Sequence, residues 1–481
     1  MESFQVIENK DFIGRSFERE KLHALGEAGS PGIAVLYGRR RVGKTELLEQ
    51  TFRARNILKF EGLEGKPERA QMLSVMQDLA SYAAQPLLKE VDVQCWKDVF
   101  SHIYSHVQHG VWTIYFEEVQ WLAEYHDNFI SELKFAWDNY FRRNNKLLLI
   151  LCGSSPSFMI NHVMHSKSLY NRSQHEIHLE EFTLSEARQY LGSNYAKRDV
   201  MDAYLTVGGI PVYLEQLKQD SSIWLSLCKN AFTKDAFFSK EYQRIFISSM
   251  GDDPVYRQVI EFLSKRHHAT RNEILAHLKM PSGGRFSALM HDLEMCGFIR
   301  KYVPVFSGES SKLVRYCIED AYLRFYYNFI KPIAGEITRG KYNKIPVTAI
   351  NQSAYQKWLG FAFERFCRRY TDVIADILKF SAVQYQSGAY YNRSTSQQDS
   401  GFQIDLLYDR ADNVLTVCEI KYLTGKVPKK VINDFEMKLA HLKTKKEKTI
   451  HKVLITAEGA EQSVIEQGYF DRILTLDDFF S

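Results

Sequence analysis

Hydrophobic and polar positions change their pattern three times along the chain. Up to about residue 180, short apolar runs such as 33–37 and 147–152 alternate with amphipathic stretches, which is typical of parallel strands joined by helices. Residues 181 to about 330 follow mainly the helical period, with a short β-like excursion near 298–318. From residue 353 a helix precedes alternating strands and a basic helix. The pattern therefore predicts a multidomain α/β protein.

Composition narrows the class of protein. At 481 residues we expect about three domains, and 45% hydrophobic with 25% charged residues excludes a disordered or fibrous chain. The net charge is only +4, so nucleic acid could be bound only through a local basic patch. Seven single cysteines without a CxxC pair argue against a disulfide framework and a zinc site. No apolar run is long enough to span a bilayer. We therefore expect a cytoplasmic protein without membrane contact.

A glycine-rich loop follows the first apolar run. Residues 38–45 read Gly-Arg-Arg-Arg-Val-Gly-Lys-Thr and fit GxxxxGK[ST] between a strand-like and a helix-like segment. In this motif backbone N–H groups surround the phosphates, the lysine reaches the β- and γ-phosphates, and the threonine offers its hydroxyl to Mg²⁺. The predicted ATP-binding residues of this loop are Gly38, Arg41, Val42, Gly43, Lys44, Thr45 and Glu46.

Two carboxylates end the next apolar strand candidate, residues 113–116. A P-loop needs an acid at the end of a neighbouring strand to hold Mg²⁺ and polarise water. We assign Glu117 to the metal, although many P-loop ATPases have aspartate there, and Glu118 to the general base. After the strand at 147–152, Ser154 is the candidate sensor of the γ-phosphate. Arg172 could contact the γ-phosphate in cis, act on a neighbouring subunit of a homo-oligomer, or be a plain surface arginine.

Three segments add a family resemblance. Residues 12–20 (Phe-Ile-Gly-Arg-Ser-Phe-Glu-Arg-Glu), 153–155 (Gly-Ser-Ser) and 208–214 (Gly-Gly-Ile-Pro-Val-Tyr-Leu) resemble the archaeal-type ATPases, a branch of the AAA+/STAND P-loop group. The resemblance covers about the first 330 residues. It implies that Ile13 and Arg15 lie near the adenine and that residues 183–250 form a helical lid.

The middle of the chain predicts a winged helix. Residues 270–278 form a helix with a capping box, 281–284 a turn, 285–295 a second helix, and a strand starts at 298. The resembled family carries such a domain at this place. If it reads DNA, Arg285 and His291 would face bases. A packing or protein-contact module is an equal alternative.

The C-terminal part carries a second constellation. Residues 401–408 and 414–422 predict a hairpin with Asp405 on one strand and Glu419 and Lys421 on one side of the other. Two carboxylates and a lysine suit metal-assisted phosphodiester cleavage. The set resembles the PD-(D/E)XK nucleases, which implies an acid on a preceding helix and makes Glu364 the third metal ligand. The alternatives are an ordinary cross-strand ion pair and a nuclease fold that does not cut.

The basic helix that follows, about 429–448, offers lysines as a phosphate track, namely Lys438, Lys443, Lys445, Lys446 and Lys448.

These interpretations combine into one architecture and two functions. The predicted order is a P-loop parallel α/β/α ATPase core (1–180), a helical lid (181–250), a winged helix (251–330), a linker (331–352) and a restriction-endonuclease-like α/β domain (353–481). We predict an ATP- and Mg²⁺-dependent ATPase whose nucleotide state regulates a DNA endonuclease, in DNA repair or defence against foreign DNA. The alternative is an ATP-dependent DNA- or protein-binding switch or regulator with an inactive nuclease fold.

Overall fold

The computed structural model describes residues 3–166, 173–250, 253–266, 268–303, 305, 314–392, 402–442 and 447–480. The chain folds as two compact units. The first contains Met1–Phe182, Gln243–Asp253 and Ala288–Cys296, and the second contains Thr183–Tyr242, Pro254–Ser287 and Gly297–Ser481. The five-part division of the sequence remains a prediction. Its connector, 331–352, holds short helices in the structure, at Lys331–Ile333, Ala334–Thr338 (α17) and Pro346–Ala349.

The first unit is built on a five-stranded parallel sheet. Its strands lie in the order β2-β3-β4-β1-β5, and the central β1, β3 and β4 are almost entirely buried because helices cover both faces. This confirms the predicted parallel α/β core. The strands are β1 (Gly32–Tyr37), β2 (Asn56–Glu61), β3 (Trp112–Glu117), β4 (Leu147–Gly153) and β5 (Ser173–His178).

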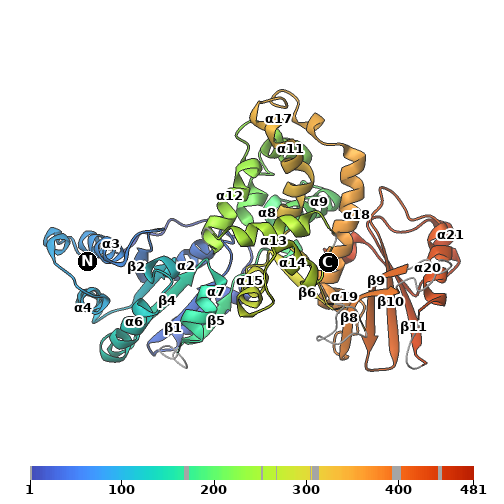
Figure 1. Ribbon diagram of the computed structural model, residues 1–481. Helices are drawn as coiled ribbons and strands as arrows, with labels where there is room; N and C mark the ends of the chain where they lie inside the picture. The colour runs from blue at the N-terminus through green and yellow to red at the C-terminus, as the bar shows by residue number, and fades with distance from the viewer. Residues whose placement is uncertain are drawn as a thin grey trace. The chain divides into compact units, whose positions relative to one another are not determined.

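Two hydrophobic clusters hold the helices of the first unit to this sheet. Figure 1 draws the strands and most of the helices of this unit in blue to blue-green. One contains Trp96, Phe100 and Phe129, whose rings pack edge to face or stacked, and the other contains Leu22, Leu47 and Phe52. The helices are α1 (Ser16–Glu27), α2 (Lys44–Phe52), α3 (Glu68–Ala83), α4 (Trp96–Val107), α5 (Val119–Leu122), α6 (Asn128–Asn139) and α7 (Pro156–Phe158). Short turns of helix follow at Pro86–Glu90, Phe141–Arg143 and Met159–Met164.

Helices and one small strand pair make up the N-terminal part of the second unit. The capping box expected before residue 271 is present, with Thr270 and Glu273 bonding each other's backbone N–H groups. Two helices, α12 and α15, contribute residues to both units. β6 pairs antiparallel with β7. The elements are α8 (Leu184–Leu191), α9 (Lys197–Val207), α10 (Pro211–Glu215), α11 (Ile223–Phe232), α12 (Phe237–Met250), α13 (Pro254–Ser264), α14 (Arg271–Leu278), α15 (Gly284–Met295), β6 (Ile299–Tyr302), β7 (Arg315–Ile318), α16 (Ala321–Phe325) and Tyr326–Ile330.

The C-terminal part of the second unit is a mixed five-stranded sheet in the order β12-β11-β10-β9-β8. β8, β9 and β10 run antiparallel, and β11 and β12 continue parallel to β10. Apolar residues of α20 pack on the sheet with Val417 and Leu454. The elements are α18 (Gln352–Arg369), α19 (Thr371–Ile377), β8 (Tyr385–Asn392), β9 (Phe402–Arg410), β10 (Val414–Lys421), α20 (Lys430–Ala440), β11 (Thr449–Thr456), α21 (Gln462–Glu466), β12 (Arg472–Leu474) and α22 (Leu476–Phe479).

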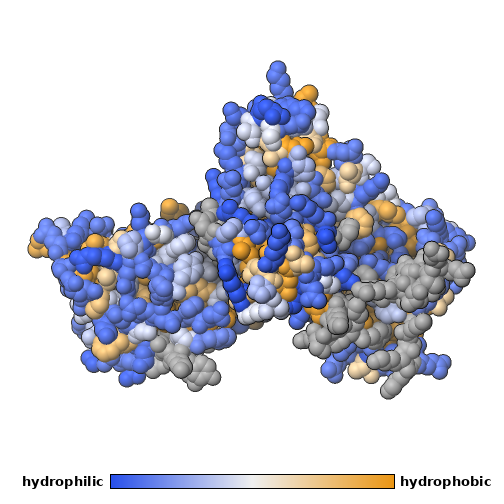
Figure 2. Space-filling model, viewed as in Figure 1, coloured by the Kyte–Doolittle hydropathy of each residue, from blue (hydrophilic) through white to orange (hydrophobic). Residues whose placement is uncertain are grey.

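Hydrophilic residues cover most of the visible surface of each unit in Figure 2. Within the described ranges, no helix combines the length and the apolar character needed to cross a bilayer.

Candidate functional site

The P-loop connects the end of β1 to the start of α2, and its backbone is shaped to surround an anion. Gly38 cannot carry a side chain, because a Cβ there would lie 2.2 Å from the carbonyl oxygen of Leu179. Arg41 and Gly43 have φ angles of 71° and 94°, and such left-handed residues turn successive amide groups toward one side. α2 begins at Lys44, so its free N–H groups face the loop. The loop therefore fits a phosphate group.

The predicted phosphate and metal residues meet at this loop. Lys44 Nζ donates to the carbonyl oxygens of Gly38 and Arg39, each at 2.9 Å, which holds the ammonium group inside the loop. Thr45 Oγ1 donates to Glu117 Oε1 at 2.5 Å, across 72 residues of sequence. The fold thus brings the helix start together with the acid at the end of β3. Thr45 and Glu117 would hold the Mg²⁺ of a bound nucleotide, which supplies positive charge beside the phosphates.

Glu118 is held in one orientation beside the end of β4. Its Oε2 accepts hydrogen bonds from Ser154 Oγ at 2.5 Å, from Ser154 N at 3.3 Å and from Gln120 Nε2 at 2.5 Å. Its left-handed backbone, with φ 51°, forms the turn from β3 into α5. The structure therefore places the candidate base and the candidate γ-phosphate sensor in direct contact, and their roles remain predictions.

The segment before α1 contacts the P-loop directly. Arg15 is buried, and its Nη2 donates to the carbonyl oxygen of Val42 at 2.9 Å. Ile13 is half-buried in the same segment. Glu46, predicted to bind ATP, accepts a hydrogen bond from Asn9 Nδ2 at 2.8 Å. These contacts fix the N-terminal segment on the nucleotide loop, and the proximity of Ile13 and Arg15 to adenine remains a prediction.

Sequence reasoning missed a lysine behind the metal-binding acid. Lys59 Nζ on β2 lies 3.0 Å from Glu117 Oε2 and 3.1 Å from Glu49 Oε1. Burial alone would lower the pKa of Lys59, but Glu117 and Glu49 raise it above its ordinary value. Gln120, which bonds Glu118, was also missed. The available signal for Lys59 was a single cation interrupting an apolar strand, which argues for a buried partner.

We expect Glu118→Gln to leave ATP affinity within about threefold and to reduce ATP hydrolysis about 100-fold, because general-base catalysis contributes on this order. The amide keeps the shape and still accepts the hydrogen bond from Ser154 Oγ. Glu61→Gln is the matched control, since Glu61 ends the neighbouring strand in register with Glu117. Steady-state phosphate release and nucleotide titration measure both quantities. If Glu118→Gln hydrolyses ATP at the wild-type rate, Glu118 is not the general base.

A second group of candidate residues meets in the C-terminal sheet. β9 and β10 pair so that Leu406 lies opposite Cys418, and the next position in this register places Asp405 opposite Glu419. Asp405 Oδ2 also accepts a hydrogen bond from Ile420 N at 3.3 Å. Asp405 is 7% exposed and Glu419 is fully buried. The predicted hairpin is present, and its two carboxylates lie inside the fold.

Two lysines neutralise Glu419. Lys421 Nζ lies 2.7 Å from Glu419 Oε1, so the two side chains share one side of β10 as the sequence predicted. Lys438 Nζ, from α20, lies 2.9 Å from Oε1 and 2.7 Å from Oε2. Lys438 therefore does not belong to an outward phosphate track. Both carboxylate oxygens are occupied by ammonium groups, which balances a charge that would be costly to bury alone.

Glu364 joins this site from α18. Burial, and then the neighbouring Asp405, raise the pKa of Glu364 to about 7. Burial, and then Glu419, raise the pKa of Asp405. Arg368 lies 3.6 Å from Glu364 and donates to the backbone oxygen of Asp405 at 3.3 Å. Asp405 therefore lies close enough to both other acids for their charges to interact with its own. In their present positions, the described residues hold no group of three or more His, Cys, Asp or Glu side chains spaced to bind a metal ion.

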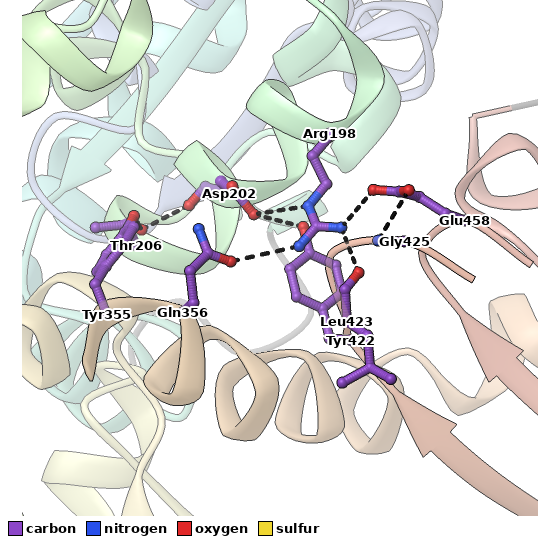
Figure 3. A network of polar contacts seen from close by, with 9 residues as sticks. All are labelled: Arg198, Asp202, Thr206, Tyr355, Gln356, Tyr422, Leu423, Gly425 and Glu458. Carbon is purple, nitrogen blue, oxygen red and sulfur yellow. Dashed lines mark hydrogen bonds and ion pairs between the residues drawn. The ribbon is translucent and has the colours of Figure 1, made fainter. Parts of the chain in front are cut away.

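Helix α9 holds the segment that follows Lys421 (Figure 3). Arg198 Nη1 donates to the carbonyl oxygen of Leu423 at 2.7 Å and to Glu458 Oε1 at 3.0 Å, and its guanidinium lies 4.2 Å over the Tyr422 ring. Tyr422 donates to Asp202 at 2.5 Å. These contacts from α9 therefore fix the position of the two residues that follow β10, Tyr422 and Leu423.

The remaining predicted residues lie partly outside the described ranges and partly on the protein surface or in ion pairs. Arg172, Lys443, Lys445 and Lys446 lie outside the described residues. Lys448 forms an ion pair with Asp409, so it too is not part of a free track. Arg285 and His291 are exposed on α15, opposite its buried apolar residues Phe286, Leu289 and Leu293. A role in reading DNA remains a prediction for both.

A family model matches the part of the chain that contains the first site. Residues 12–217 match the model of a family described as an ATPase domain predominantly from Archaea. This region contains the complete P-loop and the acids at the end of β3. The N-terminal part of the chain is a P-loop ATPase domain. The matched region continues through α8 and α9, so it extends into the second unit.

More distant similarities cover longer parts of the chain. An uncharacterized protein of Methanocaldococcus jannaschii is 24% identical over 434 residues, which is 89% of this chain and 91% of that protein. A Walker-type ATPase of Pyrococcus abyssi superposes with a TM-score of 0.48 and 16% identity, over 68% of this chain and 98% of its own. The ORC2 protein of Aeropyrum pernix gives a TM-score of 0.45 and 10% identity, over 71% and 98% of the two chains.

Proposed function

We propose that this protein is an ATPase whose nucleotide state controls a magnesium-dependent nuclease site for DNA in its C-terminal part. The observation that carries the nuclease half is the hairpin that sets Asp405 beside Glu419 and Lys421, together with Arg368 of α18, which links Glu364 to the backbone of Asp405. Burial beside another carboxylate raises the pKa of Glu364 and of Asp405, and a bound cation would relieve such a charge. This set of side chains suits metal-assisted hydrolysis of a phosphodiester.

The donor chemistry fits a hard cation, and Lys438 accounts for the resting arrangement. Glu364, Asp405 and Glu419 would hold Mg²⁺, which supplies charge against the phosphate and lowers the pKa of a bound water. Lys438 now takes both oxygens of Glu419. Lys421 stays on the same side of β10 and would neutralise charge that develops on the phosphate. In this proposal Lys438 leaves Glu419 when the metal binds.

We propose that α9 relays the nucleotide state to the nuclease site. α9 lies within residues 12–217, yet it belongs to the second unit and fixes Tyr422, next to Lys421. A nucleotide-driven shift of α9 would move the end of β10, which carries Glu419 and Lys421. This is the basis for regulation rather than two independent activities.

The decisive experiment incubates the full chain with linear, circular and single-stranded DNA and with RNA. Each substrate is tested with Mg²⁺ or Mn²⁺ and with ATP, ADP or no nucleotide. We expect cleavage of DNA that requires metal and changes with the nucleotide. If no substrate is cut under any combination, the nuclease half of the proposal fails while the ATPase assignment stands.

Arg198→Ala tests the link. We expect ATP hydrolysis to stay within about twofold of wild type, because Arg198 lies outside the P-loop, while the effect of ATP on cleavage falls about tenfold, the change that losing one charged hydrogen bond produces. Lys197→Ala is the matched control, since the neighbouring Lys197 forms a partly exposed ion pair with Asp477. Cleavage time courses with and without ATP give the ratio. A wild-type ratio in Arg198→Ala would exclude α9 as the link.

A second candidate function follows from the lysine contacts of Glu419. If the two ion pairs are permanent, the C-terminal sheet is an inactive nuclease fold, and the protein is an ATP-dependent switch that binds DNA or protein. This candidate predicts DNA binding that needs no Mg²⁺ and is unchanged in Asp405→Asn. Binding measured in EDTA and in Mg²⁺ separates the two functions.

A further inference from the structure

A cavity of about 480 Å³ lies in the second unit beside the candidate nuclease site. β6 and β7, α18, and strands β8 and β9 contribute its walls. Glu364 and Gln403 line it, and Gln403 Nε2 lies 3.5 Å from Asp405 Oδ1. A volume in the range of about 300–1,000 Å³ is usual for sites that bind small organic ligands. The cavity therefore has the size of a binding site and opens beside the carboxylates.

Basic side chains outnumber acidic ones in this cavity. Its charged lining consists of five cations and two carboxylates, namely Arg300, Lys301, Arg324, Arg365, Arg368, Glu319 and Glu364. Both carboxylates already form ion pairs with arginines of the lining. Glu319 lies 3.8 Å from Arg300 and 3.7 Å from Arg324, and Glu364 lies 3.6 Å from Arg368. The lining thus carries positive charge that its own acids do not balance.

Two arginines of the lining hold buried N–H groups that donate no hydrogen bond. Within the described part of the chain, Nε and Nη2 of Arg365 and Nη2 of Arg324 are buried and donate no hydrogen bond, although Arg324 Nη2 lies 3.7 Å from Glu319 Oε2. Burial, and then the adjacent Arg324, lower the pKa of Arg365 well below its ordinary value. Folded proteins rarely leave buried charged donors unsatisfied, because each one loses its hydration without replacement. A bound anion would satisfy these groups.

We propose that this cavity binds the phosphate group of a nucleotide unit, with Arg324 and Arg365 as its ligands. A guanidinium group matches the geometry of phosphate oxygens through paired N–H donors. Tyr302 and Phe361 also line the cavity and offer aromatic surface to a base. The phosphate could belong to a DNA strand end or to a free mononucleotide. Its assignment to DNA rests on the proposed function, whereas the anion site itself does not.

Binding to the full chain in EDTA tests the proposal without any cleavage. The probes are a short DNA strand with a 5′-phosphate, the same strand with a 5′-hydroxyl, and AMP. We expect Arg365→Met to weaken the phosphate-bearing probes about tenfold or more, as expected for a lost charge-assisted hydrogen bond. Lys229→Met, which removes an exposed lysine of α11 that pairs with Asp220, should bind as wild type does. The P-loop is intact in all variants, so only differences between them report on the cavity.

Thermal unfolding without ligand provides the second readout. Arg365→Met should melt at or above the wild-type temperature, because it removes a buried charge that lacks a partner. Arg300→Met is the second variant. The Arg300 side chain is 41% exposed, so this protein should fold, and it should also bind the phosphate probes more weakly. Tighter binding of the 5′-phosphorylated strand than of AMP identifies the strand as the source, and the reverse identifies the mononucleotide. Unchanged affinity for all phosphate probes in both variants would overturn the proposal.

Discussion

Lys44→Ala is expected to lower ATP hydrolysis by at least about 100-fold, the usual effect of removing one group that stabilises charge in the transition state. Lys44 is buried in the loop, and its ammonium group already sits on the carbonyl oxygens of Gly38 and Arg39. A bound nucleotide would exchange these oxygens for phosphate oxygens. Without Lys44 the loop keeps its shape but loses the cation that the phosphates need.

Arg40→Ala is the control from the same loop. Arg40 is half exposed and lies 4.0 Å from Glu64, so it contributes little to the loop's interior. Hydrolysis by Arg40→Ala should stay within about twofold of wild type, and thermal unfolding should confirm that both variants are folded. If Lys44→Ala hydrolyses ATP as fast as Arg40→Ala, the P-loop does not bind the phosphates as described.

Asp405→Asn is expected to lower metal-dependent DNA cleavage about 100-fold or more, because it removes the charge of one metal-binding carboxylate. The amide oxygen can still accept the hydrogen bond from Ile420 N. The fold should therefore be kept, and ATP hydrolysis should stay at the wild-type rate, since the P-loop lies in the other unit. Cleavage rates over a range of Mg²⁺ concentrations would separate weaker metal binding from slower chemistry.

Asp409→Asn is the matched control on the same strand. Asp409 forms an ion pair with Lys448 and lies opposite Leu415 of β10, away from Glu419. Cleavage by this variant should match wild type, because a partly exposed ion pair contributes at most about 1 kcal/mol of stability. Equal cleavage by Asp405→Asn and Asp409→Asn would rule out Asp405 as a metal ligand.

The two predicted sites differ in how far sequence reasoning reached. The P-loop, the acids after β3 and the Asp405–Glu419 hairpin depend on short spacings, and the structure places them as predicted. The prediction that the lysines of 429–448 form an outward phosphate track was wrong for Lys438 and Lys448, which form ion pairs with Glu419 and Asp409. Lys438 lies 19 residues from Glu419 in sequence but contacts it directly, because α20 packs on the sheet. A run of lysines cannot reveal which of them points inward.

Local sequence patterns were enough to predict the parallel sheet, the nucleotide loop and the identity of the candidate acids. These follow from local rules, since glycines permit a left-handed loop and side chains two apart share a face of a strand. Only the tertiary structure decided that Lys59 neutralises Glu117, that Arg198 holds Tyr422, and that Arg324 and Arg365 line one cavity. These pairs join segments whose order and orientation are set by packing of whole elements. Periodicity reports which face of an element is buried, but it does not report which partner that face meets.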